Sequence, residues 1–197
     1  MRYLYAKGFV MSQSDKFNIG KQPIAHSSND FEIFLDMDGV ISDFGRHVDE
    51  TGMRREDGTP DYKKLSDKSW YVTMPVYPGA RQFYDDLTKI GRVRFLTAPL
   101  VHVECFSGKA EWIKNFVPER KNFILRDLMI VASKDKYLVA KPGRVLIDDR
   151  EGNVKAWTDA GGIGIHHTGD YAQTLKALEQ TYQEYQQKKD PLPPFKR

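Results

Sequence analysis

The sequence predicts an α/β protein with a parallel sheet, covered by helices on both faces, and a small insertion after the first strand. Two observations lead to this fold class. Short apolar runs of strand length alternate along the chain with segments whose apolar residues recur at helical spacing. One polar, turn-rich segment, residues 45–77, interrupts the alternation after the first run. Because strands that alternate with crossover helices pair in parallel, the elements predict a three-layer arrangement.

Five short runs have the composition of buried strands. They are FEIFLD at 31–36, VRFLTA at 93–98, LMIVAS at 128–133, RVLIDD at 144–149 and GIGIHH at 162–167. Several of them end in acids or small polar residues, which places polar side chains at strand ends.

Three longer segments have the periodicity of helices. In residues 78–91 the apolar side chains from Ala80 to Ile90 share one face, and Gly91 follows as a cap. Residues 107–117 form a second amphipathic segment. The last helix, residues 170–188, is predicted to begin at Asp170 as its N-cap and to pack a stripe of tyrosines and leucines on the core.

The composition suits one domain and excludes several classes of protein. The chain has 197 residues, 40% of them hydrophobic, which is enough to bury a core. The net charge of +3 is mild and its cations are interleaved with acids, so stable nucleic-acid binding is not expected. Cys105 is the single cysteine and cannot form an internal disulfide. No apolar stretch is long enough to span a bilayer, so we expect no membrane partner and a cytoplasmic location.

Four parts of the chain differ in pattern. Residues 1–30 form a leader of unclear role, residues 31–44 and 78–188 a core domain, residues 45–77 a small cap insertion, and residues 189–197 a solvated tail.

Chemically active side chains follow the predicted strands at their carboxyl ends. In chain order they are Asp36 and Asp38 before Gly39, Thr97 after the second run, SKDK at 133–136, and Asp148 and Asp149 after the fourth run. The carboxyl ends of parallel strands meet in a common crevice. Together these residues supply a nucleophile, an acid, a hydroxyl, an ammonium and an acidic pair, which phosphoryl transfer through an aspartyl phosphate requires.

The ordered motifs resemble those of haloacid dehalogenase (HAD) superfamily phosphatases, and among these most closely the 5'(3')-deoxyribonucleotidases. The matching segments are DMDGVISDF at 36–44, Pro78 and Gly79, LTAPL at 96–100, KAEWIKNF at 109–116, SKDK at 133–136 and LIDDREGNVKAW at 146–157. The resemblance spans about residues 31–167. It implies a HAD-like Rossmannoid fold with a small cap, and a Mg²⁺-dependent phosphomonoesterase that acts on (deoxy)ribonucleoside monophosphates.

The resemblance implies a role for each residue of the motifs. Asp36 is the nucleophile, and Asp38 is the general acid and then the general base. Thr97, the amide of Ala98 and Lys136 bind the phosphate oxygens. Ala98 stands where the family often has serine, so only its backbone donor is retained.

The implied cofactor is Mg²⁺, which prefers hard oxygen ligands. Asp36, the carbonyl of Asp38 and Asp148 would hold it, with Asp149 as a further or alternative ligand.

The phosphate-binding lysine is open from the residues alone. Lys134, Lys136 and Lys141 all precede the fourth strand; the resemblance selects Lys136, and Lys134 remains the alternative.

We further predict that Phe44, eight residues beyond the nucleophile, and Trp70, near the end of the cap segment, form an apolar slot for a nucleobase. The competing interpretation is that both rings only pack the cap onto the body.

Two other functions stay open. One is a HAD phosphatase that acts on another small phosphate ester or on a polynucleotide 3'-phosphate. The other is a catalytically silent HAD-fold binding protein. The expected partner is a small-molecule nucleotide substrate; a homodimer is left open, as are base and sugar preference.

Overall fold

The structure is a computed structural model that describes residues 31–120, 122 and 126–189. The predicted leader, residues 1–30, and residues 190–197 of the predicted tail lie outside the described residues. Within the described part of the chain, no helix combines the length and the apolarity that crossing a membrane requires.

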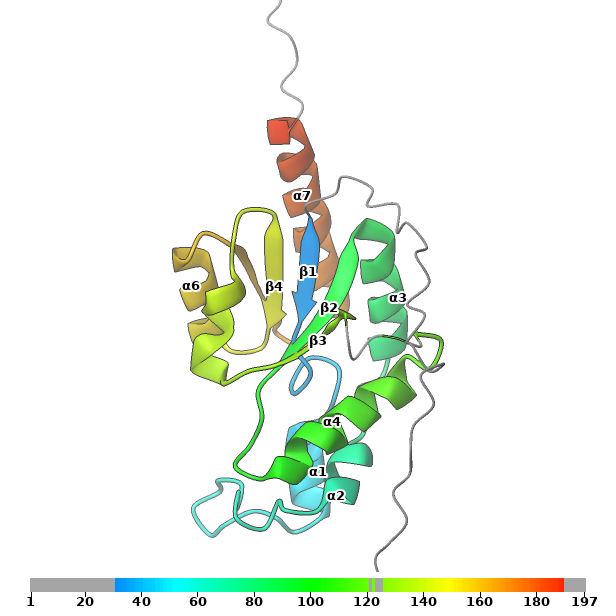
Figure 1. The fold of residues 1–197 in the computed structure, drawn as a ribbon, viewed down its shortest axis with the longest axis vertical. Coiled ribbons are helices and arrows are strands. Elements are labelled where there is room, and N and C mark those ends of the chain that lie inside the picture. Colours follow the sequence, from blue (N-terminus) through cyan, green and yellow to red (C-terminus); the bar gives the residue numbers. More distant parts are fainter. Residues whose placement is uncertain (1–30, 121, 123–125, 190–197) are drawn as a thin grey trace, which may run out of the picture.

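Five parallel strands form one sheet in the order β3-β2-β1-β4-β5 (Figure 1). They are β1 (Glu32–Leu35), β2 (Arg92–Thr97), β3 (Leu128–Ile130), β4 (Arg144–Asp148) and β5 (Ile163–His166). In the centre of the sheet, Ile33 of β1 pairs with Val93 on one side and Val145 on the other. The five predicted strands are confirmed, and so is the α/β class with a parallel sheet.

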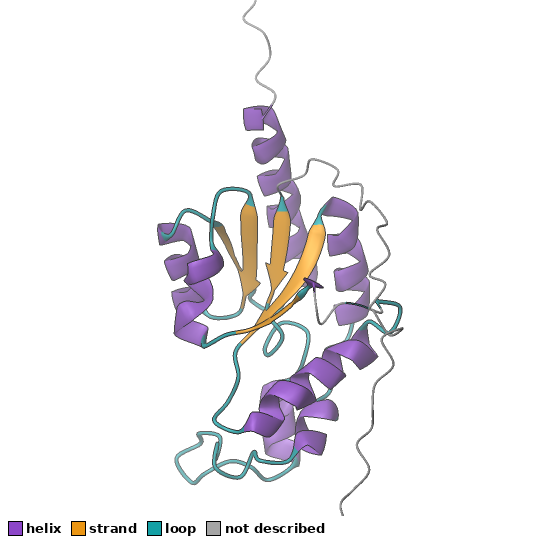
Figure 2. Cartoon of the chain, viewed as in Figure 1, coloured by secondary structure: helices purple, strands orange, loops and turns teal. Residues whose placement is uncertain are grey.

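Helices cover both faces of the sheet, as Figure 2 shows. Side chains of consecutive strand residues point to opposite faces, so Ile33 and Leu35 enter a large apolar core while Phe34 enters a smaller one. Against the large core lie α3 (Ala80–Ile90), α4 (Val103–Phe116) and α7 (Tyr171–Lys189). Against the small core lies α6 (Glu151–Asp159), whose Trp157 is fully buried. The 3-10 helix η1 (Ser133–Val139) packs beside α6.

The ends of two helices follow from local chemistry. Asp170 accepts a hydrogen bond from the backbone N–H of Gln173 at 3.1 Å, which confirms it as the N-cap of α7. Gly91 ends α3, but in an extended conformation with φ −164°, and not in the left-handed conformation of a glycine cap. The helix α4 begins at Val103, four residues before the predicted start.

The segment between β1 and α3 carries two short helices, α1 (Phe44–Glu50) and α2 (Lys68–Val72), joined by a long loop. Figure 1 shows both helices beyond the carboxyl ends of the strands, and α2 packs against α4. The contact between α2 and α4 is close, because a β-carbon on Gly108 would lie 2.6 Å from the β-carbon of Tyr71. We refer to α1, α2 and their loop as the cap.

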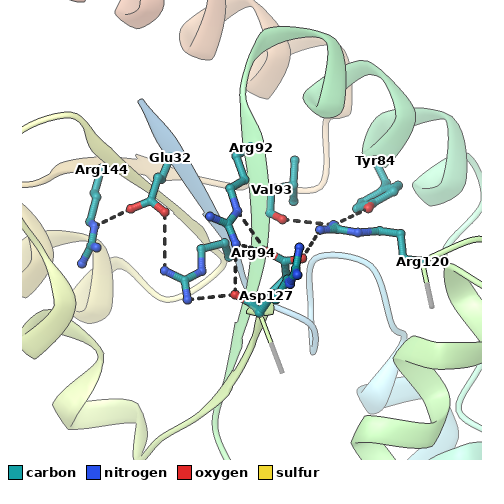
Figure 3. Close-up of polar contacts among 9 residues, drawn as sticks. Glu32, Tyr84, Arg92, Val93, Arg94, Arg120, Asp127 and Arg144 are labelled. Carbon is teal, nitrogen blue, oxygen red and sulfur yellow. Dashed lines mark hydrogen bonds and ion pairs between the residues drawn. The ribbon is translucent and has the colours of Figure 1, made fainter. Parts of the chain in front are cut away.

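A charged cluster closes the opposite, amino-terminal edge of the sheet (Figure 3). Glu32 accepts hydrogen bonds from Arg144 at 2.8 Å and from Arg94 at 3.4 Å. Asp127 accepts one from Arg92 at 2.8 Å and another from Arg120. Since Glu32, Arg92 and Arg144 are the first residues of their strands, this cluster stabilises the fold at the end remote from the predicted site.

Candidate active site

The acids predicted from the strand ends converge at the carboxyl edge of the sheet. Asp36 directly follows β1, and Asp148 ends β4, which pairs with β1. Both carboxylates are buried, with 5% of Asp36 and none of Asp148 exposed. The topology therefore places two acids that are distant in sequence side by side, in a place that water hardly reaches.

A tight turn after β1 positions Asp38. The carbonyl of Met37 accepts hydrogen bonds from the N–H groups of Ile41 and Ser42, each at 2.9 Å. Gly39 adopts a left-handed conformation with φ +78°, which glycine allows without strain. The hydroxyl of Ser42, which belongs to the same turn, donates to Asp38 Oδ1 at 3.0 Å and restrains the carboxylate.

Lys136 joins the two buried acids. Its Nζ lies 2.8 Å from Asp36 Oδ1 and 2.7 Å from Asp148 Oδ2. Burial by itself would lower the pKa of Lys136, but the two carboxylates outweigh it and raise that pKa above its ordinary value, so the ammonium stays charged. Lys134 and Lys141 are both exposed, and of these three lysines Lys136 is the one that lies with the carboxylates.

The environment raises the pKa of Asp36 to about 7. The largest cause is burial; Lys136 opposes the rise, while Asp148 and Asp38 add to it. A divalent cation beside Asp36 would also oppose the rise and favour the ionised, nucleophilic carboxylate.

Asp36, Asp148 and Asp149 could together hold a metal ion. Each offers a carboxylate oxygen, and these oxygens lie within 4.8 Å of one another. Burial, and then the charge of Asp148, raise the pKa of Asp149. These three carboxylates lie near the single ammonium of Lys136, so a bound cation would offset their excess negative charge. Hard carboxylate oxygens suit Mg²⁺, so this donor set fits the implied cofactor.

Asp148 is held from several sides. Its Oδ1 accepts from the N–H of Arg150 at 2.9 Å and from the amide of Asn153 at 3.0 Å. Asn153 lies within α6, and its side-chain amide orients Asp148. Arg150 also reaches the hydroxyl of Ser133 at 3.3 Å.

A second buried lysine, Lys109, was not singled out from the sequence. Its side chain is fully buried, and its Nζ donates to Asp38 Oδ2, to Thr97 Oγ1 and to the carbonyl of Ala98. The helical pattern of the sequence does mark Lys109 as unusual. Lys109 lies on the same face of α4 as Cys105 and Trp112, where all other large side chains are apolar.

A cavity of about 370 Å³ opens above these groups. Its lining residues are Asp36, Asp38, Gly39, Phe44, Gly45, Tyr62, Tyr77, Ala98, Leu100, Ser133, Lys136, Asp149 and Arg150. The lining thus combines three acids and Lys136 with the aromatic rings of Phe44, Tyr62 and Tyr77 and the side chain of Leu100. Thr97 is fully buried and is not part of the lining, so of the two predicted groups at the end of β2 only Ala98 borders the cavity.

The two aromatic residues predicted to bind a base occupy different places. Phe44 lines the cavity, whereas Trp70 lies behind it in the cap, with 6% of its surface exposed. The Trp70 ring packs edge-on against Phe44 at 5.5 Å between centroids, and its indole N–H donates to Thr51 Oγ1 at 2.9 Å. Trp70 therefore does not reach the cavity, because its ring fills the interior of the cap. Tyr62, which we did not anticipate, lines the cavity instead.

No protein-family model matches the chain, and no curated protein matches it. Similar solved structures exist. The HAD domain of effector protein Lem4 from Legionella pneumophila is 15% identical, with a TM-score of 0.43 over 79% of this chain and 96% of that one. A HAD-superfamily hydrolase from Ehrlichia chaffeensis is 13% identical, with a TM-score of 0.41 over 77% and 97%. A haloacid dehalogenase-like hydrolase from Streptococcus pneumoniae is 11% identical, with a TM-score of 0.42 over 76% and 90%. At these identities and TM-scores, the similarity does not establish an activity for this chain.

Proposed function

We propose that this protein is a Mg²⁺-dependent phosphomonoesterase of the HAD type that works through an aspartyl phosphate on Asp36. One observation carries the proposal: a buried carboxylate in the lining of a cavity, beside one lysine and within reach of two further acids. A buried carboxylate that is held in its ionised form is a nucleophile, and an adjacent ammonium neutralises the charge of a phosphoryl group.

Two steps make up the proposed reaction. In the first, a carboxylate oxygen of Asp36 forms a bond to phosphorus while the bond from phosphorus to the ester oxygen breaks. Asp38 supplies the proton that the leaving oxygen takes up. In the second, Asp38 removes a proton from water, the water oxygen bonds to phosphorus, and the acyl phosphate bond breaks to release phosphate and regenerate Asp36.

The other residues of the site bind the phosphate group and the metal ion. Lys136 and the backbone N–H of Ala98 would contact the phosphate oxygens. Asp36, Asp148 and Asp149, with the carbonyl of Asp38, would hold Mg²⁺. When bound, the cation offsets negative charge on the carboxylates and the phosphoryl group.

We propose (deoxy)ribonucleoside monophosphates as the substrates. The cavity volume of about 370 Å³ falls within the range of small-molecule sites. Phe44 and Tyr62 are among its lining residues, so a base could stack on their rings. A sugar phosphate would leave these rings without a partner.

Release of phosphate from p-nitrophenyl phosphate, with and without Mg²⁺, tests the reaction. We expect Mg²⁺-dependent turnover that Asp36→Asn abolishes, because the amide keeps the shape of the side chain but cannot form the acyl phosphate. Asp159→Asn, an exposed acid at the end of α6, is the matched control and should retain full activity. Substantial turnover by Asp36→Asn would rule out the covalent step, and no turnover by the wild type would favour a silent binding protein.

A substrate panel then tests the specificity. Nucleoside monophosphates should be hydrolysed faster than sugar phosphates and faster than 3'-phosphorylated oligonucleotides. Preference for the oligonucleotide would assign the enzyme to polynucleotide ends.

A further inference from the structure

Lys109 uses every donor of its ammonium inside the protein. A lysine ammonium has three N–H donors and no acceptor. Those of Lys109 reach Asp38 Oδ2 at 2.5 Å, the carbonyl of Ala98 at 2.6 Å and Thr97 Oγ1 at 3.0 Å. None of its side chain is exposed, whereas 27% of that of Asp38 is. Lys109 therefore has no donor left for a substrate and acts on the residues that hold it.

Asp38 depends on this contact for its orientation. Its Oδ1 accepts from the hydroxyl of Ser42 at 3.0 Å, and its Oδ2 is held by Lys109. Ser42 belongs to the same turn as Asp38, so Lys109 is the contact that ties the carboxylate to a separate element. Loss of Lys109 would leave the carboxylate held on one side only and free to rotate about its side-chain bonds.

The cap fixes the backbone from which Lys109 projects. At the preceding residue, a β-carbon on Gly108 would lie 3.0 Å from the carbonyl oxygen of Lys68, so α2 packs directly on the backbone of α4. Just beyond the cap, the carbonyl of Met74, two residues after α2, accepts a hydrogen bond from the Trp112 indole N–H at 2.8 Å. Lys109 is thus held at its backbone by the packing of α4 on the cap and at its ammonium by Asp38 and the end of β2.

We infer that Lys109 is a positioning residue that aims the carboxyl group of Asp38 at the leaving-group oxygen. The inference rests on the proposed function, in which Asp38 transfers that proton. A proton donor that can rotate is out of reach of the leaving-group oxygen for part of the time. Loss of Lys109 should therefore slow chiefly the esters whose leaving group must be protonated. Alkyl esters depend on this proton, whereas p-nitrophenolate departs without it.

The first test compares leaving groups in Lys109→Met, which preserves the length of the side chain and removes the charge. We expect kcat for an alkyl ester such as a nucleoside 5'-monophosphate to fall by about 100-fold or more, and kcat for p-nitrophenyl phosphate by about 10-fold or less. Lys114→Met, an exposed lysine on the same helix, should match the wild type for both. Equal losses for both esters would overturn the inference.

A double-mutant cycle provides the second test. If Lys109 acts through Asp38, adding Lys109→Met to Asp38→Asn should lower the residual turnover of the alkyl ester by less than about 3-fold. Losses that multiply would show that Lys109 only supports the fold. Should Lys109→Met fail to fold, Lys109→Arg retains the charge with altered geometry, and the same split between leaving groups is expected.

Crystal structures give a measurement that does not depend on turnover. In Lys109→Met the carboxylate of Asp38 should leave the position it has in the wild type, or occupy several, while Ser42 stays in place. An unmoved Asp38 carboxylate would overturn the inference. If the wild type hydrolyses no ester, the proposed function fails, and a displaced Asp38 would still support the positioning contact.

Discussion

The α-carbon of Gly39 faces the carboxylate of Asp149 so closely that a β-carbon on Gly39 would lie 2.2 Å from Asp149 Oδ2. Gly39 also has φ +78°. Two independent requirements meet at one residue: the left-handed turn after Asp38, and room for an acid of the candidate metal site.

Gly39→Ala should therefore impair both stability and metal binding. The left-handed conformation costs a residue with a β-carbon about 1–2 kcal/mol, and the new methyl group must displace Asp149. We expect a lower melting temperature and a higher Mg²⁺ concentration for half-maximal activity. Gly152→Ala is the control, since its added β-carbon would meet no atom within 4 Å apart from the adjoining residues and backbone of its own helix, and alanine favours the helix α6. An unchanged Mg²⁺ requirement in Gly39→Ala would contradict the metal role of Asp149.

The raised pKa of Asp36 predicts how the stability of the metal-free protein varies with pH. The native state keeps a proton on this group up to about pH 7, whereas the ordinary value is 3.8. Between these values the native state binds more protons than the unfolded chain, so the free energy of unfolding falls as the pH rises. The loss is on the order of a few kcal/mol at most.

Asp36→Asn should remove much of this loss. Thermal unfolding in chelator, from pH 4.5 to 8, should show a smaller decline for the variant and a melting temperature above that of the wild type at pH 7.5. An identical decline in both proteins would mean that burial of Asp36 is not its cause.

Substitutions of the aromatic residues that line the cavity should have different effects from substitution of the aromatic residue buried in the cap. Phe44→Ala and Tyr62→Ala should lower kcat/KM for nucleoside monophosphates by about 10- to 100-fold, the equivalent of about 1–3 kcal/mol of base stacking. Hydrolysis of ribose 5-phosphate, which lacks a base, should barely change. Trp70→Ala should instead cost about 3–5 kcal/mol of stability, because that ring is buried in the cap. Equal losses for nucleotide and sugar phosphate would remove the support for a base slot.

The charged cluster at the amino-terminal edge should affect stability alone. Asp127 is 5% exposed and accepts from Arg92 and Arg120, as Figure 3 shows. Asp127→Asn should lower the free energy of unfolding by about 1–3 kcal/mol, since an amide accepts these hydrogen bonds more weakly. Asp86→Asn, which breaks the exposed pair with Lys89, should cost less than about 1 kcal/mol. Chemical denaturation measures both, and a change in kcat for Asp127→Asn would contradict the remoteness of the cluster.

Local patterns in the sequence were enough to predict the sheet, its covering helices and the gathering of acids at one edge. Alternation of strand and helix requires parallel pairing, and parallel pairing brings Asp36 and Asp148 to the same end whatever the details of packing. The N-cap at Asp170 is likewise local, because its hydrogen bond spans three residues. These features depend on backbone direction and on neighbours along the chain.

Tertiary structure alone decided which side chains face the cavity. Lys109 meets Asp38 across 71 residues of sequence, through a helix whose position is set by the close approach of α2 at Gly108. Contacts with Phe44 and Thr51 hold Trp70 inside the cap, whereas Tyr62 lines the cavity. A motif specifies the type and order of its residues, but the direction of a side chain depends on contacts between distant segments, which spacing along the chain does not contain.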